Sequence, residues 1–193
     1  WSHSFKWKPS KYNTIDFLIK VKKNEGNYDE INYIYSDGVD TATSSDIKSY
    51  KTLILMCGFD EKKHGYMNPC ALMLEDEIRT DKSKDNYKPL PFYPTDPYDD
   101  NAYLCNIGLK RDMNGDLQMF TEEEEIIEDN TIVEFRYELN NESRWRWIPL
   151  RVRNDKTFQY RSRITKNYGN DYGTALSNWH SIHNPITEKM LIT

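Results

Sequence analysis

Short apolar runs rich in β-branched and aromatic residues recur along the chain and predict strands. In the first run, from Thr14 to Val21, the charged residues Asp16 and Lys20 interrupt the apolar positions. Turn-forming residues separate the runs, and Asn114-Gly115 is the strongest hairpin signal, because Asn-Gly accepts the positive φ angles of a tight turn. The other predicted strands are 31–35, 52–57, 70–74, 103–109, 117–120, 131–139 and 145–152.

Two parts of the chain depart from this pattern. Residues 81–100 carry four prolines among Asp, Tyr and Lys, and proline removes a backbone donor from a strand ladder. We therefore expect a long surface loop or insertion there. Residues 175–182 predict a helix, which Asn184-Pro185 ends. Together these elements predict a mainly β fold: an OB-fold barrel with insertions, one or two short helices and a C-terminal helical tail.

The composition adds limits on the kind of protein. The chain has 193 residues, of which 37% are hydrophobic and 30% charged, so we expect one domain with a small core. No apolar run approaches ~18 residues, which predicts no membrane partner and a cytoplasmic location. The three cysteines are widely spaced and predict buried thiols rather than disulfides or zinc ligands. His180 and His183 lack an evident third ligand, so no metal site is predicted.

The charge of the chain is segregated. The formal net charge is −5, yet residues 1–23 carry +5 and residues 143–166 carry +7, which leaves −17 for the remainder. Such segregation predicts a basic surface on an acidic body and favours a polyanionic ligand such as a nucleotide or RNA.

Both basic segments contain candidate phosphate-binding residues. In an extended Phe5-Lys6-Trp7-Lys8-Pro9 segment, Lys6 and Lys8 would point to the same side and could clamp a phosphate. Lysines at this spacing are also common on exposed strands that bind nothing.

The second segment runs from Arg144 to Lys156. Arg151 and Arg153 are expected on one strand face with two free guanidinium groups, which suit phosphate oxygens. Asp155 and Lys156 are expected at the strand end, where Asp155 could orient Lys156 or an arginine. The alternative is a strand edge kept charged to prevent aggregation.

These residues carry a resemblance to a known family. Residues 5–9 followed by Asn13-Thr14-Ile15-Asp16-Phe17 resemble motif V of the GTP:RNA guanylyltransferases, the mRNA capping enzymes. Residues 147–157 resemble motif VI, the RxRxDK sequence of their C-terminal OB domain. Residues 170–187 are similar to the junction before the cap methyltransferase in the fused enzymes of large cytoplasmic DNA viruses. The resemblance implies a nucleotidyltransferase end at 1–12, an OB domain at 13–166 and a linker towards a methyltransferase at 167–193.

In that family a Lys-x-Asp-Gly lysine attacks the α-phosphate of GTP, and the GMP then passes to the 5′-diphosphate end of RNA with the help of Mg or Mn. The resemblance implies that motif V cations contact the α-phosphate and that motif VI residues close over the nucleotide and orient its β- and γ-phosphates. The residues so implied are Lys6 and Lys8 for motif V and, as catalytic residues, Arg151, Arg153, Asp155 and Lys156 for motif VI.

One departure from the family limits this expectation. No Lys-x-Asp-Gly sequence occurs in the chain, so we expect no guanylyl transfer by this domain alone and no cofactor bound to it. The implied partners are an upstream nucleotidyltransferase domain, a downstream methyltransferase domain and the 5′ end of RNA. If the source is viral, the virus factory or the virion is the expected location.

Two other function classes stay open at this point. A single-stranded RNA-binding OB module could use Trp145 and Trp147 as stacking platforms between Arg144 and Arg146. A protein-interaction domain within a capping complex could instead dock a basic partner on the acidic residues, which a solvated turn also explains. These acidic residues are Glu122 to Glu125, Glu128 and Asp129.

Overall fold

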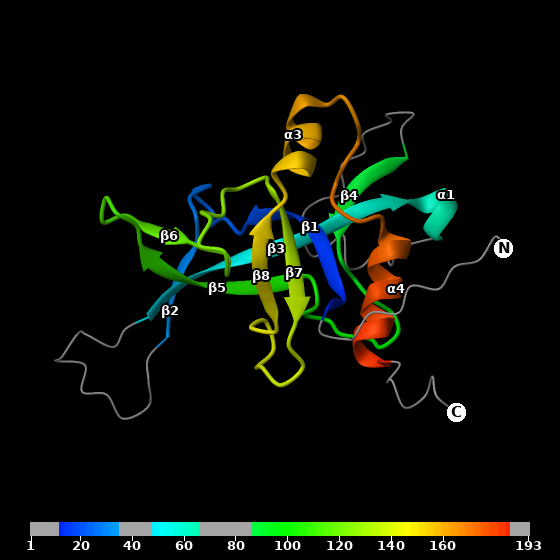
Figure 1. Cartoon of the computed structure of the whole chain (residues 1–193), viewed down its shortest axis with the longest axis horizontal. Helices are drawn as coiled ribbons and strands as arrows, with labels where there is room; N and C mark the ends of the chain where they lie inside the picture. The colour runs from blue at the N-terminus through cyan, green and yellow to red at the C-terminus, as the bar shows by residue number, and fades with distance from the viewer. Residues whose placement is uncertain (1–11, 35–47, 66–85, 186–193) are drawn as a thin grey trace.

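The computed structural model describes residues 12–34, 48–65 and 86–185, and it shows a mainly β protein. The strands form one curled sheet, with helices packed around it (Figure 1). The strands are β1 (Thr14–Val21), β2 (Ile31–Ile34), β3 (Lys48–Asp60), β4 (Tyr87–Pro91), β5 (Leu104–Arg111), β6 (Leu117–Met119), β7 (Ile132–Tyr137) and β8 (Trp147–Val152). The helices are α1 (Glu61–His64), α3 (Asn154–Ser162) and α4 (Tyr172–His183).

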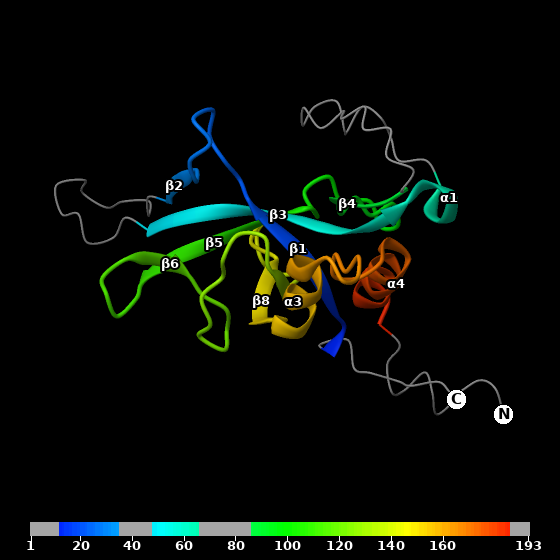
Figure 2. The same ribbon diagram turned by 90° about the horizontal axis from the view of Figure 1, so that it is seen from above.

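Strand β3 organises the sheet because it changes partners along its length. On one side it pairs first with β2 and then with β1, and on the other side first with β5 and then with β4. The main strand order is β6-β5-β3-β1-β7-β8, and all these pairs are antiparallel. Figure 2 shows β3 running along most of the molecule, with β2 at one end and β4 and α1 at the other.

The two ends of the strand order approach each other as the sheet curls. The backbone N–H groups of Glu122 and Glu123, which follow β6, donate to the carbonyls of Pro149 and Leu150 in β8 at 2.9 and 3.1 Å. These bonds join the two ends without a regular ladder. The curled sheet is consistent with an OB-like barrel, as the strand pattern predicts.

The core is mainly aromatic and lies inside the curl. Phe17 of β1 meets Trp147 of β8 edge-on, with ring centroids 5.1 Å apart, and both side chains are buried. Helix α4 adds Ala175 and Trp179 to the same core, and the Trp179 ring lies 6.0 Å from that of Trp147. The part of the tail described by the structure therefore packs on the barrel and shares its core.

Most predicted strands are confirmed, β1 with the predicted bounds. Strand β3 extends well beyond the predicted 52–57, and the helix predicted at 175–182 starts earlier, at Tyr172. The hairpin at Asn114-Gly115 is confirmed, because Gly115 has φ 89° between β5 and β6. The predicted strand at 70–74 lies outside the described residues.

The prediction of a loop over 81–100 is wrong for residues 87–91, whereas residues 92–100 lie outside the helices and strands. Residues 87–91 form β4, and Phe92 after it is fully buried. Phe92 donates its N–H to the Leu55 carbonyl of β3. Successive backbone nitrogens of a strand point to alternate sides, so the nitrogens of Pro89 and Pro91, which carry no hydrogen, point away from β3. Prolines are tolerated there because β4 pairs with β3 alone among the described strands.

Helix α3 was not predicted. Its sequence, Asn-Asp-Lys-Thr-Phe-Gln-Tyr-Arg-Ser, has no apolar stripe, and Thr157 is its one buried residue. Tyr160 packs on a small apolar cluster on the opposite face of the sheet from the main core, formed by Leu18, Met56 and Ile132. Tertiary contacts therefore fix α3, and hydrophobic periodicity does not reveal it.

Two of the three cysteines lie within the described residues and match the prediction. Cys57 and Cys105 are fully buried free thiols, and burial raises the pKa of both. Cys70 lies outside the described residues. Among the described helices, none has both the length and the apolar character needed to cross a bilayer.

Candidate functional site

A buried carboxylate in the first strand is the centre of the candidate site. Asp16 alternates with core residues Ile15 and Phe17, so its side chain leaves β1 on the opposite face, yet the residue is only 5% exposed. Asn170 binds both backbone groups of Asp16: the Asp16 N–H donates to Asn170 Oδ1, and the Asn170 N–H donates to the Asp16 carbonyl, each at 2.7 Å. Gly169, with φ 84°, permits this close approach.

Two cations of the RxRNDK segment converge on this carboxylate. Arg153 Nη1 and Lys156 Nζ each lie 2.6 Å from Asp16 Oδ2. Helix α3 brings them there because its start is bound to β7: the Arg153 N–H donates to the Ile132 carbonyl, and the Ile132 N–H donates to Thr157 Oγ1. The side chains of Arg153 and Lys156 remain about a quarter exposed, at 24% and 23%.

Asp155 binds the same arginine from the solvent side. Arg153 Nε and Nη2 donate to its two carboxylate oxygens at 3.3 and 3.2 Å. The hydrogen bond from Arg153 lowers the pKa of Asp155 and outweighs the small opposing effect of burial. The prediction that Asp155 could orient an arginine is therefore confirmed in its geometry, with Arg153 as the arginine.

A second ion pair extends the site along the sheet. Arg151 and Glu134 are opposite each other on β8 and β7, and Arg151 Nε donates to Glu134 Oε2 at 2.7 Å. Thr14 Oγ1 donates to the other Glu134 oxygen at 2.6 Å. Burial alone would raise the pKa of Glu134, but the hydrogen bonds from Thr14 and Arg151 and the charges of Arg151 and Arg153 lower it.

The expectation of two free guanidinium groups on one strand face is wrong. Arg151 pairs with Glu134, and Arg153 lies beyond the end of β8, where all its nitrogen atoms face carboxylates. A β-bulge between Glu134 and Phe135 shifts the register of this strand pair. Asp155 and Lys156 lie in the first turn of α3 rather than on the strand.

The remaining donors differ between the cations. An ammonium group has three donors, and within the described residues Lys156 uses one of them, for Asp16. Arg151 is half-exposed and uses its Nε. Arg153 has no nitrogen left without a partner. Lys156 and Arg151 can therefore accept an additional anionic partner more readily than Arg153 can.

The structure adds little on the motif V lysines and on the histidines near the C-terminus. Lys6 and Lys8 lie outside the described residues. The structure does not bring His180 and His183 together with a third ligand: no group of three His, Cys, Asp or Glu suited to a metal ion is found in the described ranges. His183 Nδ1 instead lies 2.9 Å from the Trp179 carbonyl.

The sequence reasoning did not assign Asp16, Glu134 or Asn170 to the site. Asp16 left a signal, because it is a charged residue between the apolar residues Ile15 and Phe17 in a strand that the fold largely buries. Glu134 breaks the β7 run in the same way. Asn170 left no pattern, since its role depends on the close approach of two segments that are far apart in the chain.

The comparison with curated proteins shows what the chain is similar to. The chain is 30% identical over 190 residues to a protein described as a probable mRNA-capping enzyme of Acanthamoeba polyphaga mimivirus. The alignment covers 97% of the chain and 13% of that relative, so the chain spans about an eighth of the protein it matches. No family model and no solved structure matches the chain.

Of the two tryptophans considered as RNA-stacking platforms, Trp147 is too deeply buried to stack on a base. Trp147 is 1% exposed, and its Nε1–H donates to the Ala102 carbonyl inside the core. Trp145 precedes β8 and is half-buried against Tyr50, with ring centroids 5.2 Å apart. The core interpretation therefore holds for Trp147.

The acidic segment after β6 binds mainly to its own protein. Glu122 pairs with Arg136, Glu125 Oε2 accepts from the Val152 N–H, and Asp129 Oδ1 accepts from the Val21 N–H. These contacts help to join β1, β7 and β8. These three carboxylates therefore stabilise the fold, and they are less available to a basic partner than unpaired carboxylates would be.

Proposed function

We propose that this chain is an OB-like domain of an mRNA capping guanylyltransferase, and that it positions the phosphates of GTP for transfer of GMP to the 5′-diphosphate end of RNA. The observation that carries the proposal is the convergence of Arg153 and Lys156 on Asp16. It joins the Asn-Thr-Ile-Asp-Phe segment to the RxRNDK segment, and both belong to a chain similar to a probable capping enzyme.

In this proposal the residues of the site divide the work. Lys156 and Arg151 keep unused donors and would contact phosphate oxygens, where fixed positive charge stabilises the charge that develops on the leaving pyrophosphate. Arg153 would be a positioning residue, because each of its three nitrogen atoms already donates to Asp16 or Asp155. Asp16 would hold both cations before the nucleotide arrives, so little reorganisation would be needed on closure.

The Mg or Mn of the complete reaction would be held by other parts of the enzyme. The carboxylates of this site are Asp16, Glu134 and Asp155, and each already binds one or two cationic side chains. They do not fit a metal site. The nucleophilic lysine would likewise lie elsewhere in the complete enzyme, and Lys6 and Lys8 would contact the α-phosphate.

Formation of the covalent protein–GMP adduct from labelled GTP tests the proposal in a complete capping enzyme that contains this segment. Lys156→Ala should reduce the adduct at least about tenfold, because a charge-assisted contact to the leaving phosphates is lost. Arg144→Ala removes a cation from the other end of β8 and should leave the adduct yield unchanged.

The outcome is clear in either direction. Equal adduct yields from Lys156→Ala and the unaltered enzyme would overturn the assignment of Lys156. The 193-residue chain alone should stay unlabelled under the same conditions, and a stable adduct on it would contradict the expected position of the nucleophile. Thermal unfolding of each variant separates loss of chemistry from loss of fold.

A further inference from the structure

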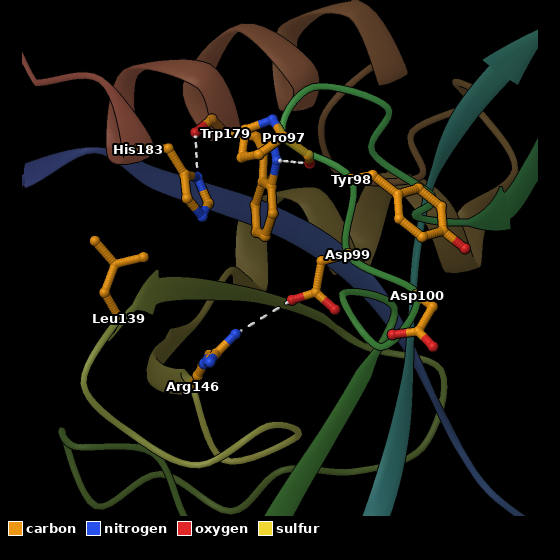
Figure 3. A pocket seen from close by; sticks show the side chains of 8 residues that line it. All are labelled: Pro97, Tyr98, Asp99, Asp100, Leu139, Arg146, Trp179 and His183. Carbon is orange, nitrogen blue, oxygen red and sulfur yellow. Dashed lines mark hydrogen bonds and ion pairs between the residues drawn. The ribbon is translucent and has the colours of Figure 1, made fainter.

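A pocket that shares no lining residue with the Asp16 site has no role in the proposed function. Its volume is about 360 Å³, and it lies between the end of α4 and the segment that follows β4 (Figure 3). Its lining combines aromatic, acidic and basic side chains: Pro97, Tyr98, Asp99, Asp100, Leu139, Arg146, Trp179 and His183.

One wall of the pocket rests on a cluster of tightly packed aromatic rings that are tilted or edge-on to one another. The His183 ring lies 4.1 Å from that of Trp179, which lies 4.8 Å from that of Tyr137. His183 Nδ1 donates to the Trp179 carbonyl, so the imidazole orientation is set within α4. The half-buried His183 therefore presents a flat ring that is held before any ligand arrives.

The opposite wall is held just as firmly. Trp179 Nε1–H donates to the Pro97 carbonyl at 2.8 Å, which ties this segment to α4. Asp99 accepts from the Tyr137 hydroxyl at 2.9 Å and from the Asn101 N–H at 2.8 Å. Burial raises the pKa of Tyr137 to about 12, which keeps this hydroxyl a donor. Asp99 thus shapes the pocket and is already satisfied.

The exposed side chains supply unused recognition groups. Tyr98 is 76% exposed, and Figure 3 shows it with Asp100 on the side of the pocket away from His183. Asp100 Oδ1 accepts from Asn101 Nδ2, and Oδ2 makes no hydrogen bond within the described residues. Arg146 donates its Nε to the Asn141 carbonyl, and its Nη1 makes long contacts of 3.4 and 3.5 Å with the Tyr137 hydroxyl and Asp99. Its Nη2 makes no hydrogen bond within the described residues and could bind an anion.

We propose that this pocket binds a guanine nucleotide. The flat rings of His183 and Tyr98, which both line the pocket, suit a nucleobase, because stacking needs only a π-face on each partner. A carboxylate accepts hydrogen bonds and cannot donate them, and the guanine edge offers N1–H and N2–H₂ donors side by side, whereas the corresponding position of adenine is an acceptor. Arg146 would pair with the phosphate. This site is separate from the Asp16 site and does not require guanylyl transfer.

The test is titration of the 193-residue chain with GMP, AMP and ribose 5-phosphate, observed by NMR at the Trp179 indole N–H and the His183 ring. We expect GMP to shift these signals at lower concentration than AMP, and ribose 5-phosphate to shift them least. Shifts of equal size and affinity with GMP and AMP would overturn the guanine assignment.

Two exposed substitutions locate the ligand in the pocket. Tyr98→Ala should weaken GMP binding at least about fivefold, as expected for loss of one stacking partner. Asp100→Asn should reduce the preference for GMP over AMP about tenfold, because a carboxylate acceptor for the guanine edge is lost. Tyr28→Ala is the matched control, since Tyr28 is 75% exposed and lies on the hairpin before β2. Unchanged GMP affinity in Tyr98→Ala would refute the site.

The same titration separates two sources of guanine. Short RNAs that begin with guanosine or with adenosine replace the mononucleotides. If the guanosine RNA binds more tightly than GMP, the ligand is an RNA end. If the two bind equally, the ligand is the free nucleotide. Either result supports the pocket. Failure of all guanine ligands would overturn this inference and leave the adduct experiment on Lys156 unaffected.

Discussion

Two arginines lie at or just beyond each end of strand β8, and the two ends have different electrostatic environments. At one end Arg151 and Arg153 meet Glu134, Asp16 and Asp155, all within 3.3 Å. At the other end Arg144 binds the neutral side chain of Asn101. There Arg146 binds the Asn141 carbonyl and reaches Asp99 only at 3.5 Å.

The same Arg-x-Arg pattern therefore serves two purposes. Where three carboxylates gather, the cations are held in fixed positions and their charge is largely balanced. Where neutral partners dominate, the guanidinium groups keep more of their field for a ligand. The sequence spacing of the arginines is identical at both ends, so the difference arises entirely from the residues that the fold brings to each end.

The largest effect is expected from the backbone that supports Asp16. A Cβ atom on Gly169 would lie 2.4 Å from the Asp16 carbonyl oxygen, and its φ of 84° disfavours side chains. Gly169→Ala should lower the free energy of unfolding by about 3 kcal/mol, measured by urea denaturation. Gly115→Ala is the control, because Gly115 has φ 89° with open space around it and should cost about 1 kcal/mol. Equal costs would show that the close approach at Asp16 is unimportant.

A smaller loss is expected from removing the shared carboxylate. Asp16→Ala leaves Arg153 and Lys156 without their common partner, and we expect a loss of about 2 kcal/mol. This is less than a fully buried ion pair costs, because both cations are partly hydrated. Arg144→Ala at the other end should change the stability by less than about 0.5 kcal/mol. If urea denaturation gives equal losses for the two variants, the contrast between the ends is wrong.

The smallest effect is expected from pH. The folded pKa of Glu134 lies below its ordinary value of 4.5, so its contribution to stability is complete above that value and is lost as the pH falls through the folded pKa. Glu134→Gln should therefore reduce the dependence of unfolding free energy on pH between neutral pH and the acid range. An unaltered dependence in this variant would contradict the proposed ionisation.

Sequence patterns predicted much of the fold and half of the candidate site. Strand β1 was predicted with its observed bounds because its composition and turn residues are local signals. Arg151, Arg153, Asp155 and Lys156 were singled out by their motif. Helix α3 was missed, since it has no apolar stripe, and β4 was missed because the prolines that argue against a strand are tolerated at this position.

The sequence by itself determined the strand-forming runs, the Asn-Gly turn and the two arginine pairs that flank the β8 core. Only the tertiary structure decided which arginines are neutralised and where a pocket forms. Asp16 is 137 residues from Arg153 and 140 from Lys156, and the pocket joins α4 to the segment after β4. Such contacts depend on the curl of the sheet and the docking of two helices, and the energy of a charge depends on the partners and burial that those events supply.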